Sequence, residues 1–282
     1  MSLSRKRAAL GAILIAITLT PTLPAQSIDN QAAQQEPSDS SVEEAITHGV
    51  AAFKSGRFAD AVRHFKAAVA FDPSSNQARL YLGVSYSYQV VPNLNTPDNL
   101  ATANNAINIL KQIPESAPEH LAALKQVATL YRNTSRFNQA KETELQVLKL
   151  EPTDVESQYA IGVIDWTQAY KNAVRILATA YLTDDGNGNT KLNISACQEL
   201  SGQNSSLVQD GIDHLTHAID IKPDFEDAMQ YLNLTYRRQA DLACGDDTKR
   251  TEAIALADQW TQKAAFVRQK KQAHSAPTNE AP

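Results

Sequence analysis

Small and apolar residues recur along most of this chain at spacings of three and four, the period that places side chains on one face of an α-helix. The pattern is clearest over residues 48–73, where Gly56 marks a turn and Pro73 a helix end. This segment predicts two short amphipathic helices joined by a tight turn. Small residues such as Gly49 and Ala61 let the two helices approach closely, and phenylalanine rings fill the space between them.

Copies of the second helix follow along the chain with the same internal spacing. Each has small or apolar residues at steps of four, three and five that end in a proline. The four sets are Ala61, Phe65, Ala68, Pro73; Ala106, Leu110, Ile113, Pro118; Ala140, Glu144, Val147, Pro152; and Gly211, Leu215, Ala218, Pro223. Ten residues after these prolines stand Gly83, Ala128, Gly162 and Asn233. Because one hairpin cannot bury its own apolar face, we expect the hairpins to stack.

These spacings resemble the tetratricopeptide repeat family, whose unit is a helix–turn–helix of about 34 residues. The resemblance covers roughly residues 41–268 and is strongest over 49–73 and 124–152. It implies an all-α fold, an α-solenoid of about five helix–turn–helix units. The expected units are 42–75, 76–120, 121–154, 155–225 and 226–271. Departures from the family pattern are His48 and Glu144, where the family prefers apolar or aromatic residues, and Asp165 and Thr261.

Three of the expected units carry an insertion in their internal turn. The step between the small residues of the paired helices is 12 in the uninterrupted units but 23, 49 and 24 in the others, which gives insertions of 11, 37 and 12 residues. Turns within repeats share one edge of such an array, so we expect the insertions to line one edge together. The longest is expected to extend the helix that follows Asp154 as far as Leu182, before a turn at 184–189.

The N-terminus has the pattern of a secretory signal peptide. Basic residues at 5–7 precede an apolar run over 8–19 and small residues that end at Ala25. This predicts a signal peptide over 1–25, removed after Ala25. An uncleaved anchor is the alternative, although the apolar run is short for a bilayer span. We therefore expect a periplasmic or secreted protein with no membrane span after cleavage and, since no cysteine lies near the cut, no lipid attachment.

Two polar segments flank the predicted solenoid of residues 41–271. Residues 26–40 are expected to be a disordered linker and 272–282 a disordered tail, because both lack an apolar period. Removal of the three basic residues of the signal peptide takes the net charge from −5 to −8. An acidic chain without a basic face argues against a nucleic-acid partner.

Cys197 and Cys244 are the 2 cysteines of the sequence, and they fall in neighbouring insertions. A cysteine pair in an exported protein is usually a disulfide. The repeat register independently brings both residues to the same edge. We therefore predict a Cys197–Cys244 disulfide, with two buried free thiols as the alternative.

Other candidate chemistry is weaker. His214 and His217, with Asp210 and Asp213 four residues before them, have spacings compatible with metal ligands, but the register places them on an outward helix face. The segment 185–189 resembles a calcium loop only in part and is better explained as a turn. No catalytic motif is found. We predict no enzyme activity, no cofactor and no metal site.

In proteins that look like this one, the first helix of each repeat lines a concave groove that binds extended peptides or partner helices. The polar and aromatic positions expected to line that groove are Gln77, Tyr88, Lys125, Arg132, Asn133, Tyr159, Trp166, Arg237 and Arg238. Tyrosine, tryptophan and arginine dominate binding hot spots. Four basic residues on one surface of an acidic chain favour a protein or peptide partner with carboxylates, such as an acidic segment.

The predicted function is therefore an exported scaffold or adaptor that mediates protein–protein interaction in a cell-envelope complex. The alternative is a ligand-binding or catalytic protein with a pocket under the inserted segment 165–210. That pocket would be lined by Trp166, Tyr170, Tyr181 and Cys197.

Overall fold

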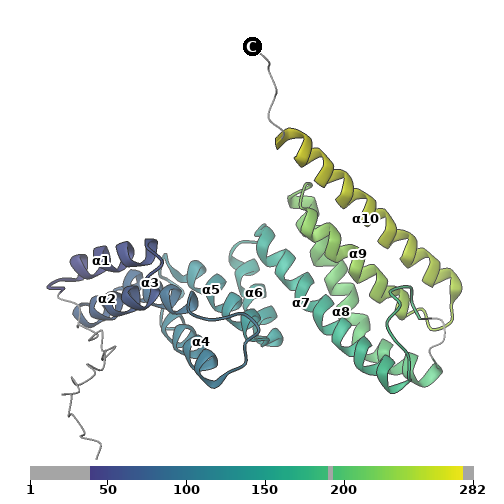
Figure 1. Ribbon diagram of the computed structural model, residues 1–282, viewed down its shortest axis with the longest axis horizontal. Helices are drawn as coiled ribbons and strands as arrows, with labels where there is room; N and C mark the ends of the chain where they lie inside the picture. Colours follow the sequence, from purple (N-terminus) through teal and green to yellow (C-terminus); the bar gives the residue numbers. More distant parts are fainter. Residues whose placement is uncertain (1–38, 190–192, 276–282) are drawn as a thin grey trace, which may run out of the picture. The chain divides into compact units, whose positions relative to one another are not determined.

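Ten α-helices account for the regular structure of residues 39–189 and 193–275, the parts of the chain that the computed structural model describes (Figure 1). They are α1 (Val42–Lys54), α2 (Phe58–Phe71), α3 (Asn76–Ser87), α4 (Pro97–Leu110), α5 (His120–Asn133), α6 (Phe137–Leu150), α7 (Val155–Thr179), α8 (Ile194–Ile221), α9 (Glu226–Asp241) and α10 (Asp247–Ser275). Consecutive helices pack in pairs, α1 with α2 through α9 with α10, and each predicted unit holds one pair. The predicted all-α class is confirmed.

The ends of the described chain differ from the predicted boundaries. The predicted signal peptide, residues 26–38 of the linker and residues 276–282 of the tail lie outside the described residues. Asp39 and Ser40, assigned to the linker, instead make side-chain hydrogen bonds to helix residues. α10 continues to Ser275, four residues beyond the expected end of the solenoid, because no proline or glycine stops it.

Short polar side chains set the start of half of the helices. The residue before α1, α3, α4, α7 and α8 accepts a hydrogen bond from the backbone N–H three positions later, which satisfies an otherwise unpaired donor. These N-cap residues are Ser41, Ser75, Thr96, Asp154 and Asn193. Prolines close the other end: Pro73, Pro152 and Pro223 follow α2, α6 and α8.

One contact recurs in three hairpins, where a glycine of the first helix meets a large side chain of the second. A Cβ atom on the glycine would lie 2.4 to 2.6 Å from that side chain, so any other residue would force the two to move apart. The pairs are Gly49–Phe65, Gly83–Leu110 and Gly162–Leu215. They are 16, 27 and 53 positions apart, so the second and third exceed the first by 11 and 37, the predicted lengths of the insertions. The insertions therefore leave the hairpin contact unchanged.

The two hairpins without an insertion share one turn geometry. Gly56 joins α1 to α2 with φ of 71°, and Ser135 takes the same place between α5 and α6 with φ of 57°. In both turns the next residue, Arg57 or Arg136, donates its N–H to a carbonyl five residues earlier, at 2.9 and 2.8 Å. A serine thus holds the left-handed conformation that glycine adopts without cost.

The first insertion is closed by a buried side chain. Asn99 of α4 accepts a hydrogen bond from the N–H of Val91 at 2.8 Å and donates to the carbonyls of Val91 and Leu94 at 3.0 and 2.7 Å. The inserted backbone also donates from Asn93 to the carbonyl of Asn133, at the end of α5. These hydrogen bonds satisfy four backbone groups of the insertion without a helix or strand.

The longest insertion lengthens both helices of its hairpin, whereas the sequence pattern predicted the extension of the first as far as Leu182. α7 has 25 residues and ends at Thr179, three residues before the expected end, while α8 has 28. The side chain of Asn193 caps the N-terminus of α8, so this helix begins at Ile194 and includes the last part of the insertion. Between them the backbone crosses to α9, where Gly188, with φ of 81°, lies so close that a Cβ would be 2.7 Å from the carbonyl oxygen of Ala240.

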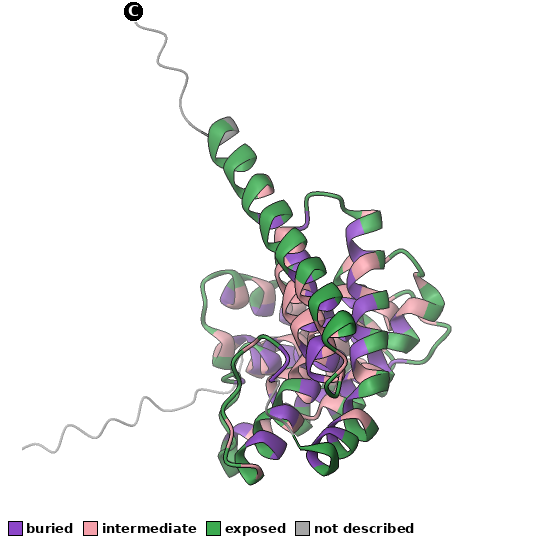
Figure 2. Cartoon of the chain, turned by 90° about the vertical axis from the view of Figure 1, so that its right-hand side faces the viewer, coloured by how far each residue is buried: buried purple, intermediate pink, exposed green. Residues whose placement is uncertain are grey.

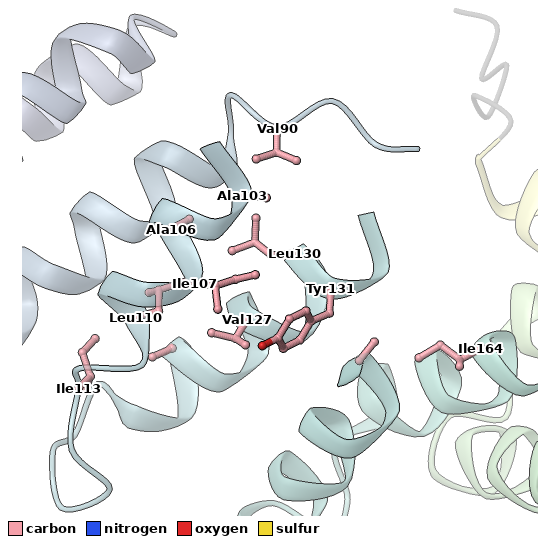
Figure 3. Packing of buried hydrophobic residues seen from close by; sticks show 12 residues of the cluster. Val90, Ala103, Ala106, Ile107, Leu110, Ile113, Val127, Leu130, Tyr131 and Ile164 are labelled. Atoms are coloured by element: carbon pink, nitrogen blue, oxygen red, sulfur yellow. The ribbon is translucent and has the colours of Figure 1, made fainter. Parts of the chain in front are cut away.

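The core follows the inner faces of the helix pairs. Figure 3 shows one of its clusters, in which Ile107 and Leu110 of α4 meet Val127 and Leu130 of α5, with Ile164 of α7 beyond them. α10 is the least covered helix, and Figure 2 shows it exposed along most of its length. Among the described helices, none combines the length and apolar character needed to cross a bilayer.

Candidate protein-binding surface

Four aromatic side chains form a continuous group on α7 and α9, which we call the aromatic shelf: Tyr159, Trp166, Tyr170 and Tyr231. Trp166 stacks on Tyr170 with ring centroids 5.3 Å apart and planes 14° from parallel. Tyr231 meets Trp166 edge-on at 5.2 Å and Tyr159 at 5.7 Å. Each ring thus fixes the orientation of the next.

The aromatic shelf is partly exposed to solvent and rests on a buried ring. Tyr170 is 40 % exposed, and the other three rings are half-buried. Phe225, itself buried, packs on Tyr159 with centroids 4.9 Å apart. Burial raises the pKa of Tyr159, so its phenol stays neutral and keeps its hydrogen for donation. Ordered, partly exposed aromatic rings are the kind of surface that forms binding hot spots.

Arg132 of α5 is within electrostatic reach of Tyr159, a member of the aromatic shelf. Its positive charge opposes the effect of burial on the pKa of Tyr159. Its Nη2 donates to Thr129 Oγ1 at 3.0 Å, and its Nε lies 3.6 Å from Oε1 of the buried Glu144. Burial raises the pKa of Glu144, which accepts a hydrogen bond from Ser157 at 2.8 Å. The side chain of Arg132 is 34 % exposed, so part of it remains available to a partner.

Lys125, on the same helix, is engaged within the chain. Its Nζ donates to Glu151 at 2.7 Å and also to Asp154, the N-cap of α7. Burial raises the pKa of Asp154, but the hydrogen bonds from Lys125 and Ser157 and the charge of Lys125 together lower it. This lysine links α5 to the turn between α6 and α7. The sequence pattern predicted that its ammonium would face a partner, but in the structure it pairs with two carboxylates of the chain itself.

The two arginines of α9 hold the long insertion, which corrects the expectation that they line a groove. Arg237 donates to the carbonyl of Gly186 and to Asp258, each at 2.9 Å. Arg238 is only 3 % exposed, with its guanidinium 2.8 Å from Asp184 and 2.9 Å from Asp241. The sequence register placed Arg238 beside Arg237 on one surface, whereas the inserted segment covers it.

The remaining predicted groove residues lie apart from the aromatic shelf. Gln77, at the start of α3, donates to the hydroxyl of Tyr81 at 3.3 Å. Tyr88 follows α3 and packs against Phe53 and Phe58 with centroids 4.9 and 5.0 Å apart. Asn133 accepts the backbone hydrogen bond from the first insertion. Of the nine residues, Tyr159 and Trp166 belong to the aromatic shelf, and Arg132 is within electrostatic reach of Tyr159.

A disulfide joins Cys197 of α8 to Cys244, which follows α9, with Cα atoms 5.6 Å apart. Cys197 is buried and Cys244 is exposed. The bond connects the two neighbouring insertions, as the sequence predicts.

The alternative pocket under residues 165–210 is not formed by the four residues proposed for it. Trp166 and Tyr170 stack in the aromatic shelf, Tyr181 is 98 % exposed, and the sulfur of Cys197 is in the disulfide. His214, considered as a metal ligand, instead has its Nδ1 2.6 Å from Gln158 Oε1.

Two departures from the repeat pattern join hairpins through polar contacts. Glu144 links α6 to α7 through Ser157. Asp165 of α7 is fully buried and accepts hydrogen bonds from Lys141 of α6 at 2.8 and 3.0 Å, while Lys141 also reaches Asp210 of α8 at 3.0 Å. Burial raises the pKa of Asp165 to about 6, although Lys141 opposes this shift.

A second apolar surface lies between α9 and α10, in an open hollow of about 1010 Å³. Met229, Val267 and Phe266 line it, with Lys263 at its rim, and Phe266 is 67 % exposed. Nothing in the described chain covers this hollow.

The sequence pattern missed one member of the aromatic shelf. Tyr231 is not among the predicted groove residues, although it supplies the edge-on contacts to both Trp166 and Tyr159. The signal available in the sequence was Tyr81 of the second unit, which stands eight positions after Pro73 just as Tyr231 stands eight positions after Pro223.

Comparison with known proteins gives a fold. No protein-family model matches the sequence, and no curated protein matches it. Solved structures of MamA, a tetratricopeptide-repeat protein, do. The chain has a tetratricopeptide-repeat fold. A crystal structure of MamA aligns with a TM-score of 0.55 at 16 % identity, over 86 % of this chain and 98 % of that one. MamA from Desulfovibrio magneticus RS-1 aligns with a TM-score of 0.53 at 12 % identity, over 81 % and 96 %.

Proposed function

We propose that this tetratricopeptide-repeat chain is a non-catalytic scaffold that binds a protein partner through the aromatic shelf. The observation that carries the proposal is the ordered group of four rings on α7 and α9, with Tyr170 exposed and Arg132 within electrostatic reach of Tyr159. Stacked rings lose little conformational entropy on binding, since they are already held in place. The repeat fold supports a binding function by analogy only.

The chemistry of the aromatic shelf indicates the partner. Lys125, Arg237 and Arg238 already bind carboxylates or carbonyls within the chain. The partner segment would therefore place an apolar or aromatic side chain on the aromatic shelf. An acidic residue beside it would meet Arg132, whose side chain is 34 % exposed and whose contact with Glu144, at 3.6 Å, is longer than the ion pairs of the other three cations.

We propose further that the scaffold is exported and works in a cell-envelope complex, in the periplasm or outside the cell. The signal-peptide pattern of residues 1–25 supports export, and so does the Cys197–Cys244 disulfide, which persists in oxidising compartments. Sequencing the N-terminus of the protein recovered from cells tests this. A mature chain that begins at Gln26 is expected, and a cytoplasmic chain that retains Met1 would contradict it.

Capture of a partner from an envelope extract, followed by measurement of its affinity, tests the binding surface. The double variant Trp166→Ala, Tyr170→Ala removes the two stacked rings. Loss of a hot spot costs about 2 kcal/mol or more, so the affinity should fall about 30-fold or more. Tyr181→Ala is the matched control, because it removes a tyrosine that is 98 % exposed and outside the shelf.

A partner lost by the double variant and kept by Tyr181→Ala would support the aromatic shelf. Equal affinity for all three proteins would reject it, and Phe266→Ala would then test the hollow between α9 and α10. Binding of a small molecule, with no protein captured by the wild type, would favour the alternative ligand-binding function.

A further inference from the structure

Three potential metal ligands converge at the first hairpin: Asp39, His48 and His64. The Nδ1 atom of His48 is 2.7 Å from one carboxylate oxygen of Asp39, and the Nδ1 atom of His64 is 2.7 Å from the other. One ligand atom of each residue lies within 4.8 Å of the others. The three side chains come from the segment before α1, from α1 and from α2, and Asp39 and His64 are 25 positions apart.

The arrangement lies beside the glycine contact of the hairpin. His48 immediately precedes Gly49, and His64 immediately precedes Phe65, whose ring packs on that glycine. The two imidazole rings are therefore held 5.4 Å apart between centroids, at 64° to one another. A histidine pair spread over two helices is fixed here without any ion.

A second carboxylate lies near the three ligands. The side chain of Asp39 is covered by its neighbours, and although burial raises its pKa, the hydrogen bonds and charges of His64 and His48 together lower it. Glu44, one helical turn before His48 on α1, is within electrostatic reach of both His48 and Asp39, and Ser40 lowers its pKa through hydrogen bonds. Two carboxylates beside two imidazoles favour a cation.

We propose that Asp39, His48 and His64 bind a divalent transition-metal ion of the zinc class. Two imidazole nitrogens and one carboxylate oxygen suit Zn²⁺, Co²⁺ or Ni²⁺, whereas Mg²⁺ and Ca²⁺ require oxygen ligands. Three protein ligands leave a coordination position for water or for a partner's side chain.

The required movement is small. Tetrahedral ligands about 2.0–2.1 Å from zinc are roughly 3.3–3.4 Å from one another, against 2.7 Å between each nitrogen and oxygen at present. The ion replaces the protons that now join the imidazoles to the carboxylate. His48 is 46 % exposed, which leaves a path for the ion to enter.

The experiment is an isothermal calorimetric titration of the purified chain with Zn²⁺ alone, after a chelator has removed any bound metal. Co²⁺ serves as a second probe, because its visible absorption reports nitrogen and oxygen ligands in a tetrahedral site. We expect one ion per chain and a rise in the melting temperature, since the ion binds only the folded hairpin. Affinity should fall as the pH is lowered, because protons compete for the imidazoles.

His64→Ala and Asp39→Asn should each weaken binding about tenfold or more, in line with the large effects of metal-site substitutions. His48→Gln guards against a folding defect, because its amide can still bond to Asp39 but is a poor ligand. His217→Ala, which removes an exposed histidine of α8, is the matched control and should bind normally.

Several results would overturn the proposal. They are the absence of saturable binding of one Zn²⁺ per chain, binding that survives His48→Gln and His64→Ala, or binding lost with His217→Ala. Equal affinity for Mg²⁺ would also reject it, because that would indicate a carboxylate site and leave the two imidazoles unused.

Discussion

The first three hairpins and the last two pack their paired helices in the same way but differ in helix length and in the segments inserted between the helices. In α1–α6 the turns are short or closed by one buried asparagine, and helices have 12 to 14 residues. In α7–α10 the helices reach 25 and 28 residues in the fourth hairpin and 29 in α10, and the inserted segments need a disulfide and two arginines to hold them. The hairpin contact itself is the same in both regions. The repeat pattern therefore determines the contact between paired helices, while each insertion is held by separate interactions of its own.

The largest effect should come from breaking the fastening of the second region. Cys197→Ser with Cys244→Ser removes a cross-link between positions 47 apart. In the chain-entropy model this lowers the unfolding free energy by about 4 kcal/mol. Native-state hydrogen exchange should show the loss in α8–α10 and leave α1–α6 unchanged, since stability in repeat arrays is largely local.

Reducing agent is the control for this experiment. It should lower the stability of the wild type to that of the double variant and have no effect on the variant. A uniform loss of protection from α1 to α10 would contradict the division into two regions.

The shared hairpin contact predicts equal costs in the two regions. Leu110→Ala in α4 and Leu215→Ala in α8 each remove a fully buried side chain that packs on a glycine. Each should lower the unfolding free energy of its hairpin by about 3 kcal/mol, within the usual range of about 2–5. Hydrogen exchange of the α3–α4 and α7–α8 peptides measures both.

Exposed leucines serve as controls, and Leu94→Ala and Leu150→Ala should cost little because these side chains are 41 % and 57 % exposed. If Leu215→Ala were as mild as Leu150→Ala, the long hairpin would be held by its additions alone, and the common contact would not stabilise it.

A smaller effect should be a difference between the two regions in how their stability depends on pH. Asp165, in the second region, has its pKa raised to about 6 by burial, so its stabilising contribution is complete below the unfolded value near 3.9 and is lost as pH rises through about 6. A difference of about two pKa units corresponds to at most roughly 3 kcal/mol. Asp39, in the first region, has a lowered pKa, so its contribution is present at neutral pH and is lost as the solution becomes acidic.

Hydrogen exchange between pH 4 and 7, corrected for intrinsic rates and carried out with chelator, measures both trends. Protection of α7 should decrease as pH rises, and protection of α1 and α2 should not. Asp165→Asn should abolish the decrease in α7. A decrease that persists in this variant would assign it to another group, of which Asp241, with a pKa raised by burial to about 7, is the first candidate.

The sequence predicted what periodicity encodes. The spacing of Gly49, Gly83 and Gly162 from their partners, the lengths of two insertions and the all-α fold all follow from apolar residues at helical intervals. The cysteine pair was also predictable, because the register placed both residues at one edge. These features depend on local patterns that recur.

The candidate surface was predicted only in part, because side-chain partners distant in sequence leave no periodic signal. Arg237 and Arg238 are adjacent on one helix, and the local sequence does not distinguish them. Asp184, which pairs with Arg238, is 54 positions away in the sequence. The departures from the repeat pattern were the better guide: His48, Glu144 and Asp165 each bind a polar partner from another element. Thr261, the fourth departure, bonds only to its own helix.

The turn at Gly56 has a practical consequence for protein engineering. Nothing lies within 4 Å of the Cβ position of Gly56, and the equivalent turns elsewhere in the chain already carry 11 or 37 additional residues without disturbing the helix contact. A guest sequence, such as an epitope or a small reporter domain, can therefore be grafted between Ser55 and Arg57 with its ends anchored on a helix pair. This chain thus offers a natural display platform in which the cargo and the scaffold are chosen separately.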